Sequence, residues 1–146
     1  MAKEAVGAMR WQVEMDGMTQ LLCKEVSGGD AEIEIIENRA TGAKGNVVVQ
    51  KIPGVTKYSN LILRRAVTDD MGFWSWIEKC LDGQVEGNRK NGTLTCYAPD
   101  NSAVAKFSFT NAWAAKYKHP QVDAAKNEVA VEELELAVET CKRQSV

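Results

Sequence analysis

The chain has 146 residues, 45% of them hydrophobic, and its 18 basic and 20 acidic residues give a net charge of −2 at pH 7. A chain of this length predicts one domain with a core large enough to need neither a metal nor disulfides. The acidic balance argues against specific nucleic-acid binding, which requires a basic face. No apolar run is long enough for a signal peptide or a membrane span, so we expect synthesis and folding in a cytoplasm.

The four cysteines and the single histidine do not form a recognisable site. Cys23, Cys80, Cys96 and Cys141 are far apart, contain no C-x-x-C pair and share only His119. Zinc sites need several closely spaced Cys and His ligands, so no metal and no cofactor is expected. Without an export signal, free and partly buried thiols are expected rather than disulfides.

The sequence also lacks a catalytic constellation. His119 has no Ser, Cys or carboxylate near it in the sequence. Residues 42–45 (GAKG) resemble a phosphate-binding loop only superficially, because a P-loop is longer and leads into a helix. Nothing selectively desolvates one member of an acidic pair such as Glu32 and Glu34, as acid–base catalysis requires. We therefore expect no enzymatic activity.

The first half of the chain is predicted to be strands and turns. Apolar and polar residues alternate from Met9 to Met15, which predicts a half-buried strand, and Asp16-Gly17 predicts a hairpin turn after it. Residues 38–46 are rich in Gly and Asn and predict an exposed loop. The remaining strands expected here are 18–26, one that begins at Ala31, one that begins at Val47 and ends at Ile52-Pro53-Gly54, and 61–67.

One helix is predicted in the middle of the chain. Its core face consists of apolar residues at helical spacing: Phe73, Trp76, Ile77, Cys80 and Leu81. Thr68, Asp69 and Asp70 supply capping oxygens before it, and Gly83 suits the left-handed residue after its C-terminus.

Strands are predicted again after the helix, over 93–98, 103–118 and 128–140, with turns at 88–92 and 99–102. The apolar face of the long strand is predicted to be Ala105, Phe107, Phe109 and Trp113. In the last strand the apolar positions change parity, which predicts a β-bulge between Glu132 and Glu133. The whole pattern predicts a single mainly β domain over residues 1–146, an antiparallel β-barrel or sandwich of about six to seven strands with one packed α-helix.

Residues 52–65 (IPGVTKYSNLILRR) resemble the tail tube proteins of contractile phages and the inner tube proteins of phage-tail-like contractile injection systems. The family's later motifs resemble, in the same order, residues 73–76 (FWSW), 82–83 (DG), 89–92 (RKNG), 111–113 (NAW) and 127–137 (NEVAVEELELA). Six ordered motifs therefore carry a resemblance that spans about the whole chain.

This resemblance implies a structural subunit without catalysis. Protomers of such proteins form hexameric rings that close their sheets into one continuous β-barrel, and the rings stack into a tube. The implied partners are further copies of the chain, a contractile sheath protein, baseplate or initiator and terminator proteins, and a cargo of DNA or effector protein in the lumen. The implied location is the bacterial cytoplasm during assembly, and then a phage virion tail or an injection particle.

The resemblance also suggests residues for two roles. An extended loop at 38–46 would reach the neighbouring ring, with Arg39, Thr41, Lys44 and Asn46 as candidates for inter-ring contacts. Six acidic residues are candidates for lining the lumen, where repetition around a ring would repel DNA or acidic cargo: Glu32, Glu34, Glu37, Glu132, Glu133 and Glu135. An ordinary solvated outer face is the alternative for these glutamates.

Two other functions remain open at this stage. The hexameric ring protein of type VI secretion resembles the same fold. A monomeric β-barrel that binds a small ligand in its interior belongs to a different class and predicts a cavity and a stable monomer. A tube subunit instead predicts exposed sheet edges and self-association.

Overall fold

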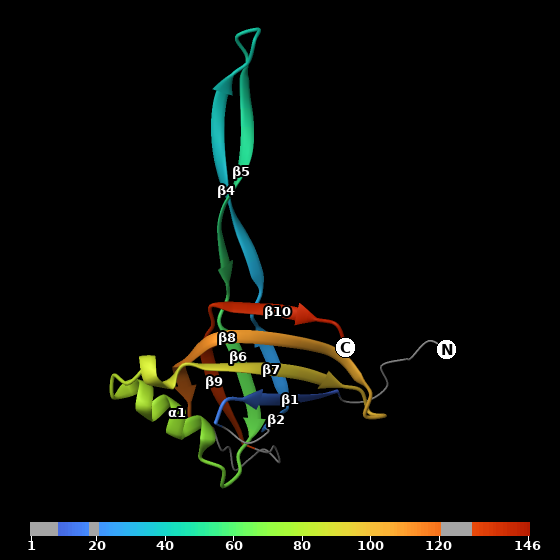
Figure 1. Ribbon diagram of the computed structural model, residues 1–146, viewed down its shortest axis with the longest axis vertical. Coiled ribbons are helices and arrows are strands. Elements are labelled where there is room, and N and C mark those ends of the chain that lie inside the picture. Colours follow the sequence, from blue (N-terminus) through green and yellow to red (C-terminus); the bar gives the residue numbers. More distant parts are fainter. Residues whose placement is uncertain (1–8, 18–20, 121–129) are drawn as a thin grey trace.

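The computed structural model describes residues 9–17, 21–120 and 130–146, and it consists of a compact β-rich body from which a two-stranded ribbon projects (Figure 1). Mainly antiparallel β structure with one α-helix is thus confirmed, although ten strands are described where about six to seven were expected. The strands are β1 (Arg10–Met15), β2 (Leu21–Cys23), β3 (Glu25–Gly28), β4 (Ala31–Thr41), β5 (Val47–Tyr58), β6 (Leu61–Ala66), β7 (Lys90–Tyr97), β8 (Ala103–Lys118), β9 (Val131–Ala137) and β10 (Thr140–Gln144), and the helices are α1 (Gly72–Leu81) and the 3-10 helix η1 (Glu86–Asn88).

The body is an eight-stranded antiparallel sheet that curls almost into a barrel. Its strand order is β2-β1-β7-β8-β9-β6-β3, with β10 paired to β8 beside β9. The two strands at the ends of this path, β2 and β3, are consecutive in the chain and are separated only by Lys24. The backbone N–H of Lys24 donates to the carbonyl of Arg64 at 2.8 Å, so one chain segment joins both ends of the sheet.

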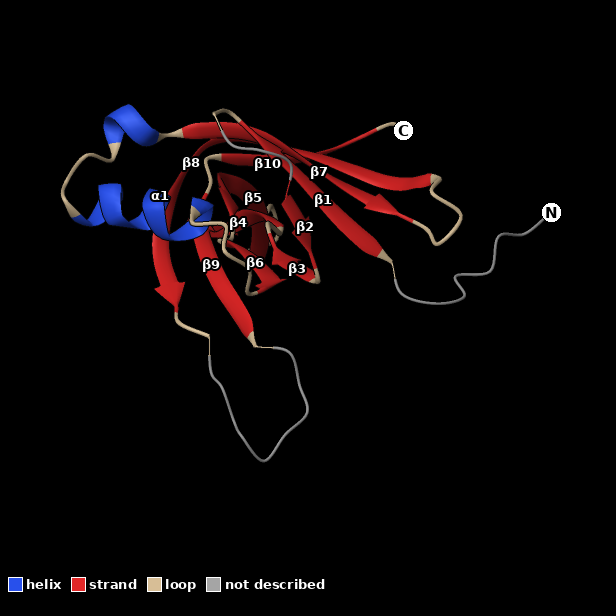
Figure 2. Ribbon diagram, turned by 90° about the horizontal axis from the view of Figure 1, so that it is seen from below, coloured by secondary structure: helices blue, strands red, loops and turns tan. Residues whose placement is uncertain are grey.

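The core lies between the strands of the body and α1, which packs against β8 (Figure 2). Phe73, Trp76 and Ile77 of α1 are buried, as the helical spacing predicts. Cys80 is half-buried, but Leu81 is 70% exposed, so its assignment to the core was wrong. The helix ends at Leu81, and the last turn extends beyond the sheet that would cover it. Gly83 has φ +85°, the predicted left-handed conformation after the C-terminus.

The change of face that the sequence suggested for the last strand occurs in β8 instead. Buried positions in β9 alternate without a break through Glu132, Leu134 and Leu136, so the predicted bulge between Glu132 and Glu133 is wrong. In β8 the register shifts around Asn111, which has φ +49°. This bulge turns Ala112 and Ala114 into the core and leaves Trp113 only half-buried, contrary to its predicted place on the apolar face.

Two predicted turns lie inside strands. Pro53 does not end β5, because the ribbon has only two strands and the missing N–H can face an unpaired edge. Asn91-Gly92 lies in β7 rather than in a hairpin turn. Gly92 is needed there for packing, since a Cβ atom would come within 2.4 Å of the Phe109 ring.

Candidate assembly surfaces

The ribbon, which comprises β4, β5 and the connecting residues 42–46, stands away from the body over most of its length (Figure 1). Its register runs from Ala31 opposite Tyr58 to Thr41 opposite Val47, with one irregularity between Ile33 and Ile35. Eight large aliphatic side chains on it are between 42% and 67% exposed: Ile33, Ile35, Ile36, Val47, Val48, Val49, Ile52 and Val55. A concentration of exposed apolar surface on one element is typical of an interface.

The loop predicted at 38–46 is shorter than expected, because regular pairing continues to Thr41 and resumes at Val47. The turn is closed by two backbone bonds, from the Gly42 N–H to the Asn46 carbonyl at 2.6 Å and from the Gly45 N–H to the Gly42 carbonyl at 3.0 Å. The four residues predicted for inter-ring contacts all lie on the outer part of the ribbon and are exposed: Arg39, Thr41, Lys44 and Asn46.

The three glutamates of β4 are exposed on the ribbon, but they do not form a purely negative surface. Glu32 lies opposite Lys57 and Glu37 lies opposite Lys51 in the β4–β5 register. Opposite charges in directly facing positions of an antiparallel pair attract each other. The charge of this surface is therefore close to balanced around Glu32 and Glu37.

Glu132 belongs to a buried ionic cluster and is not available to line an open channel. Arg65 and Glu132 are only 4% and 6% exposed, and the Arg65 Nε donates to one Glu132 carboxylate oxygen. The Tyr117 hydroxyl donates to the other oxygen at 2.7 Å, and burial together with this bond raises the pKa of Tyr117 to about 12. Arg65 also reaches Asp70 at 3.2 Å and lies over the Phe73 ring at 4.1 Å. This cluster ties the start of α1 to β6 and β9.

Glu133 and Glu135 lie on the opposite face of β9, where cations flank them. Arg64 binds Glu133 at 3.1 Å and Glu25 at 3.0 Å, and these hydrogen bonds raise the pKa of the Arg64 guanidinium. The register places Lys118 opposite Glu133 and Lys116 opposite Glu135. One column of alternating charge thus crosses β8, β9, β6 and β3 through Glu133 and Arg64, and Lys116 faces Glu135 in a second pair, so this face has no strong negative field.

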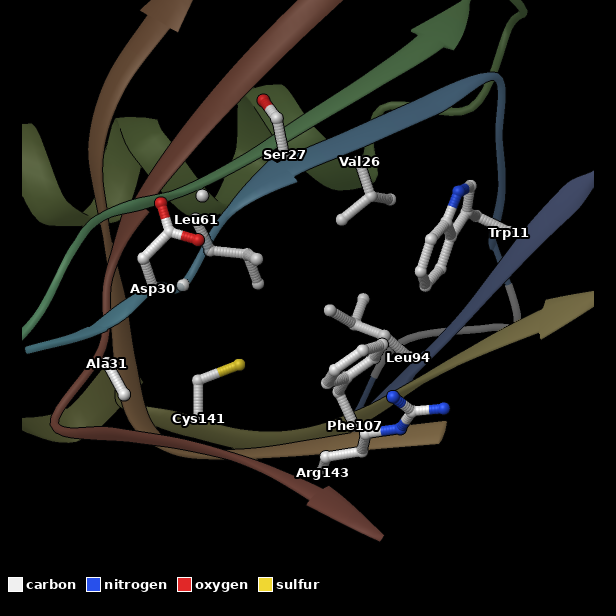
Figure 3. A pocket seen from close by; sticks show the side chains of 12 residues that line it. Trp11, Val26, Ser27, Asp30, Ala31, Leu61, Leu94, Phe107, Cys141 and Arg143 are labelled. Atoms are coloured by element: carbon white, nitrogen blue, oxygen red, sulfur yellow. The ribbon is translucent and has the colours of Figure 1, made fainter. Parts of the chain in front are cut away.

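A cavity of about 540 Å³, which we call the barrel-mouth cavity, opens between the start of β4 and strands β1, β7 and β10 (Figure 3). The side chains of Trp11, Leu94 and Phe107 point into it, and the Trp11 and Phe107 rings are 6.0 Å apart. Asp30 and Arg143 supply one charge of each sign to its lining. Cys141 lines the wall beside Gly29, and burial raises the pKa of its thiol.

Neither the projection of β4 and β5 from the body nor the buried cluster of Arg65, Glu132 and Tyr117 was predicted from the sequence. The signal for the cluster was present, because Arg65 and Glu132 each interrupt an otherwise apolar alternation. The described residues contain no group of three side chains placed to hold a metal ion, and none of their helices is long and apolar enough to cross a membrane.

The comparison with protein families identifies the class. Residues 7–142 match the family model described as T4-like virus tail tube protein gp19. The chain therefore belongs to this family, and it is a structural tube subunit. A search of curated proteins gave no match.

Solved structures agree with this assignment. A chain of the sheath–tube complex of an extracellular contractile injection system, PVC, in the extended state is 27% identical, with a TM-score of 0.77, over 94% of this chain and 89% of that one. The tube-terminating cap of the anti-feeding prophage shares the fold at 24% identity, with a TM-score of 0.79, over 100% and 95% of the two chains. Hcp1 from Flavobacterium johnsoniae is more distant, at 18% identity and a TM-score of 0.57 over 92% and 94%.

Proposed function

We propose that the whole chain acts as a single tail-tube domain that forms hexameric rings, and that these rings stack into the inner tube of a phage tail or phage-tail-like injection particle. The ribbon is the observation that carries this proposal. Its eight exposed aliphatic residues would be a liability on a permanent monomer but are suited to burial between subunits. The role needs no catalysis, in keeping with a family of structural tube components.

Unpaired strand edges supply the means to join subunits. Within the described residues β10 pairs with β8 alone, and the ribbon's two strands pair only with each other. Such edges are sites of strand addition. Pairing of these edges between neighbours would extend the curled sheet of each subunit into a continuous barrel around a lumen.

The proposed partners follow from the related particles. Tube-like chains occur in a sheath–tube complex, a tube-terminating cap and a baseplate. We infer that this chain likewise lies inside a contractile sheath, starts from a baseplate, ends at a terminator and conducts DNA or protein cargo. Assembly would take place in a bacterial cytoplasm before the particle is released.

Two sets of ribbon residues have proposed roles within the tube. Arg39, Thr41, Lys44 and Asn46 would make contacts between rings. Among the predicted lumen residues Glu32, Glu34 and Glu37 remain exposed on one strand, and of these Glu34 has no lysine opposite it in the register. Changing Glu32 and Glu34 to Lys should leave assembly intact and impair passage of cargo, whereas full delivery by assembled variant particles would contradict a lumen position.

Negative-stain electron microscopy of the purified chain at increasing concentration tests the assembly role, together with a mass measurement. The subunit has a mass of 16.1 kDa, so a hexamer of six subunits is readily distinguished from a monomer. Rings or hollow tubes are expected. A sample that stays monomeric at every concentration, and also with baseplate components added, would contradict the proposal and favour a ligand-binding barrel that uses the barrel-mouth cavity.

A further inference from the structure

The curled sheet of the body has two outer faces, which lie on opposite sides of the core (Figure 2). One is formed by β3, β6, β9 and the C-terminal half of β8, and the other by β1, β7, β10 and the N-terminal half of β8. Side chains alternate between the two surfaces of a strand, and directly opposite residues of neighbouring strands share a surface. The strand register therefore gives the composition of each outer face.

The first of these, which we call the ionic face, carries as many cations as anions. Its charged side chains are Glu25, Arg64, Lys116, Lys118, Glu133 and Glu135. Arg64 binds Glu25 at 3.0 Å and Glu133 at 3.1 Å, while Lys116 lies opposite Glu135. Three cations and three anions give the ionic face a formal charge of zero, and each anion has a cation of the same subunit beside it.

The second, which we call the hydroxyl face, has a different composition. Small hydroxyl side chains form its middle: Thr93, Thr95 and Ser108. Its charged side chains are Arg10, Glu14, Lys106 and Lys142. Three cations and one anion give it a formal charge of +2, and neither Lys106 nor Lys142 takes part in an ion pair with a described residue.

The difference matters in a hexameric ring, because a ring repeats six times the face that lines its channel. Six copies of the +2 charge of the hydroxyl face would give the channel +12. A wall of a single sign attracts cargo of the opposite charge and repels cargo of its own. The ionic face would add no net charge. Among the described residues, its strand segments also contain no strongly exposed large aliphatic side chain to which cargo could adhere.

We propose that the ionic face lines the lumen of the tube and forms a charge-balanced wall, past which cargo of either sign moves without being held. The proposal deepens the tube function and rests on it. It keeps Glu133 and Glu135 as lumen residues and adds Arg64, Lys116 and Lys118 as the cations that neutralise the wall. The hydroxyl face then lies on the outer side of the tube wall.

Two serines offer matched positions for a test, because cysteine replaces serine with little change in size and none in charge. Ser27 lies on the ionic face, two residues from Glu25 along β3, and Ser108 lies on the hydroxyl face opposite Lys142. We would make Ser27→Cys and Ser108→Cys as separate full-length variants.

The native thiols need attention in both variants. Cys80 and Cys141 are only half-buried, so the background would carry Cys80→Ser and Cys141→Ser. Cys23 and Cys96 are each 4% exposed and would be kept. The introduced cysteine is then the most accessible of the described thiols in each variant.

The location of each introduced thiol in assembled tubes tests the placement of the ionic face. Free subunits would be labelled with a monomaleimide gold cluster, mixed with an excess of unlabelled subunits, assembled and imaged by cryo-electron microscopy. We expect gold inside the lumen for Ser27→Cys and on the outer side of the wall for Ser108→Cys. Gold outside the lumen for Ser27→Cys would overturn the placement and leave the tube function standing. Absence of rings and tubes from the unmodified chain at every concentration, and with baseplate components added, would instead contradict the tube function and this inference with it.

The charge balance is tested by the rates at which the same thiols react, in unlabelled tubes, with an anionic and a cationic methanethiosulfonate reagent. At Ser27→Cys the ratio of the two rates should equal that of free mercaptoethanol and should not change with ionic strength. At Ser108→Cys the anionic reagent should be favoured roughly threefold at low salt, as expected for one unit charge about 7 Å away in water, and added salt should remove the preference. A comparable preference for either reagent at Ser27→Cys would overturn the balanced wall.

A second position covers the case in which Ser27→Cys disturbs assembly. Lys118 is exposed on β8, at the opposite edge of the ionic face from β3. Gold on Lys118→Cys should also lie inside the lumen, and an outer location in assembled tubes would contradict the proposal.

Discussion

The body and the ribbon use the same alternation of apolar and polar residues with opposite results. In β6 and β9 the alternation buries Leu61, Leu63, Leu134 and Leu136 completely or almost so. In the ribbon a comparable density of Ile and Val leaves every large aliphatic side chain substantially exposed. The difference shows that a strand's hydrophobic pattern makes a face suited to burial, but does not reveal whether the same molecule buries it.

The polar groups differ between the two regions in the same way. In the body, the charges that enter the core are satisfied locally by the Arg65, Glu132 and Tyr117 cluster, and the described residues contain no buried side-chain polar atom without a partner. In the outer part of the ribbon, beyond the irregularity between Ile33 and Ile35, the charged cross-strand pairs lie on one face and the pairs on the other face are uncharged. The body therefore satisfies its own buried polar groups, whereas the aliphatic side chains of the ribbon stay uncovered, and we expect association to cover them.

Removal of the outer end of the ribbon should have the largest effect. Deleting residues 40–45 removes the turn, shortens the ribbon and eliminates Thr41 and Lys44, two of the four residues proposed for inter-ring contacts. We expect rings to remain and tubes to be lost entirely in electron micrographs. The free energy of unfolding of the body should not change, because the ribbon does not contribute to the core cluster. Long tubes from the deletion variant would contradict the assignment.

Loss of a buried charge partner should be the most damaging single change in the body. Glu132→Ala removes the buried carboxylate from Arg65 and leaves only the more exposed Asp70 as its ionic partner, and breaking a buried pair costs about 3–5 kcal/mol. Glu133→Ala, at the adjacent position, removes a partly exposed ion pair with Arg64, and pairs open to solvent are worth about 0–1 kcal/mol. Denaturant unfolding measures both. Similar small losses at the two positions would show that the cluster is not needed for stability.

Truncation of an aliphatic side chain should separate the two regions directly. Leu134→Ala leaves a cavity in a fully buried site and should cost about 2–5 kcal/mol. Ile35→Ala on the exposed ribbon should change the stability of the free subunit by less than about 0.5 kcal/mol. An equally large loss for Ile35→Ala in a verified monomer would mean that the ribbon is part of the cooperative fold.

The smallest expected effect concerns pH and the start of α1. The Gly72 N–H, and then Arg65, donate hydrogen bonds that hold the pKa of Asp70 below its usual value. The ionised carboxylate therefore stabilises the folded state above the unfolded pKa of about 4, and this stabilisation is lost as the pH falls through the lower folded pKa. Asp70→Asn should weaken the dependence of stability on pH in this acidic range, measured by urea unfolding. An unchanged pH profile would exclude this contribution.

Much of the body could be predicted from the sequence because its patterns are local. The alternation of β1, the spacing of Phe73, Trp76 and Ile77 and the left-handed Gly83 each depend on neighbours in the chain. The bulge was placed in the wrong strand because Glu132 resembles a surface residue until Arg65, from a distant strand, is known to face it. Leu81 was misassigned because periodicity does not reveal where the covering sheet ends.

The candidate assembly site could be predicted less completely, and for a different reason. The outer end of the ribbon was located from its Gly and Asn content. The paired residues of β4 and β5 that lead up to it were interpreted as ordinary strands. Ile36, Val48 and Ile52 resemble core residues because they are suited to burial, and only the structure reveals that the body leaves them uncovered.

Hydrogen exchange of the backbone amides, compared between the free subunit and assembled tubes, tests most directly the claim that the body is complete and the ribbon is not. An isolated two-stranded ribbon is marginally stable, so the amides of β4 and β5 should exchange quickly in the free subunit and become protected in tubes. Amides of β6, β8 and β9 should be protected in both states. Strong protection of the ribbon in the free subunit, or continued fast exchange in tubes, would contradict the account.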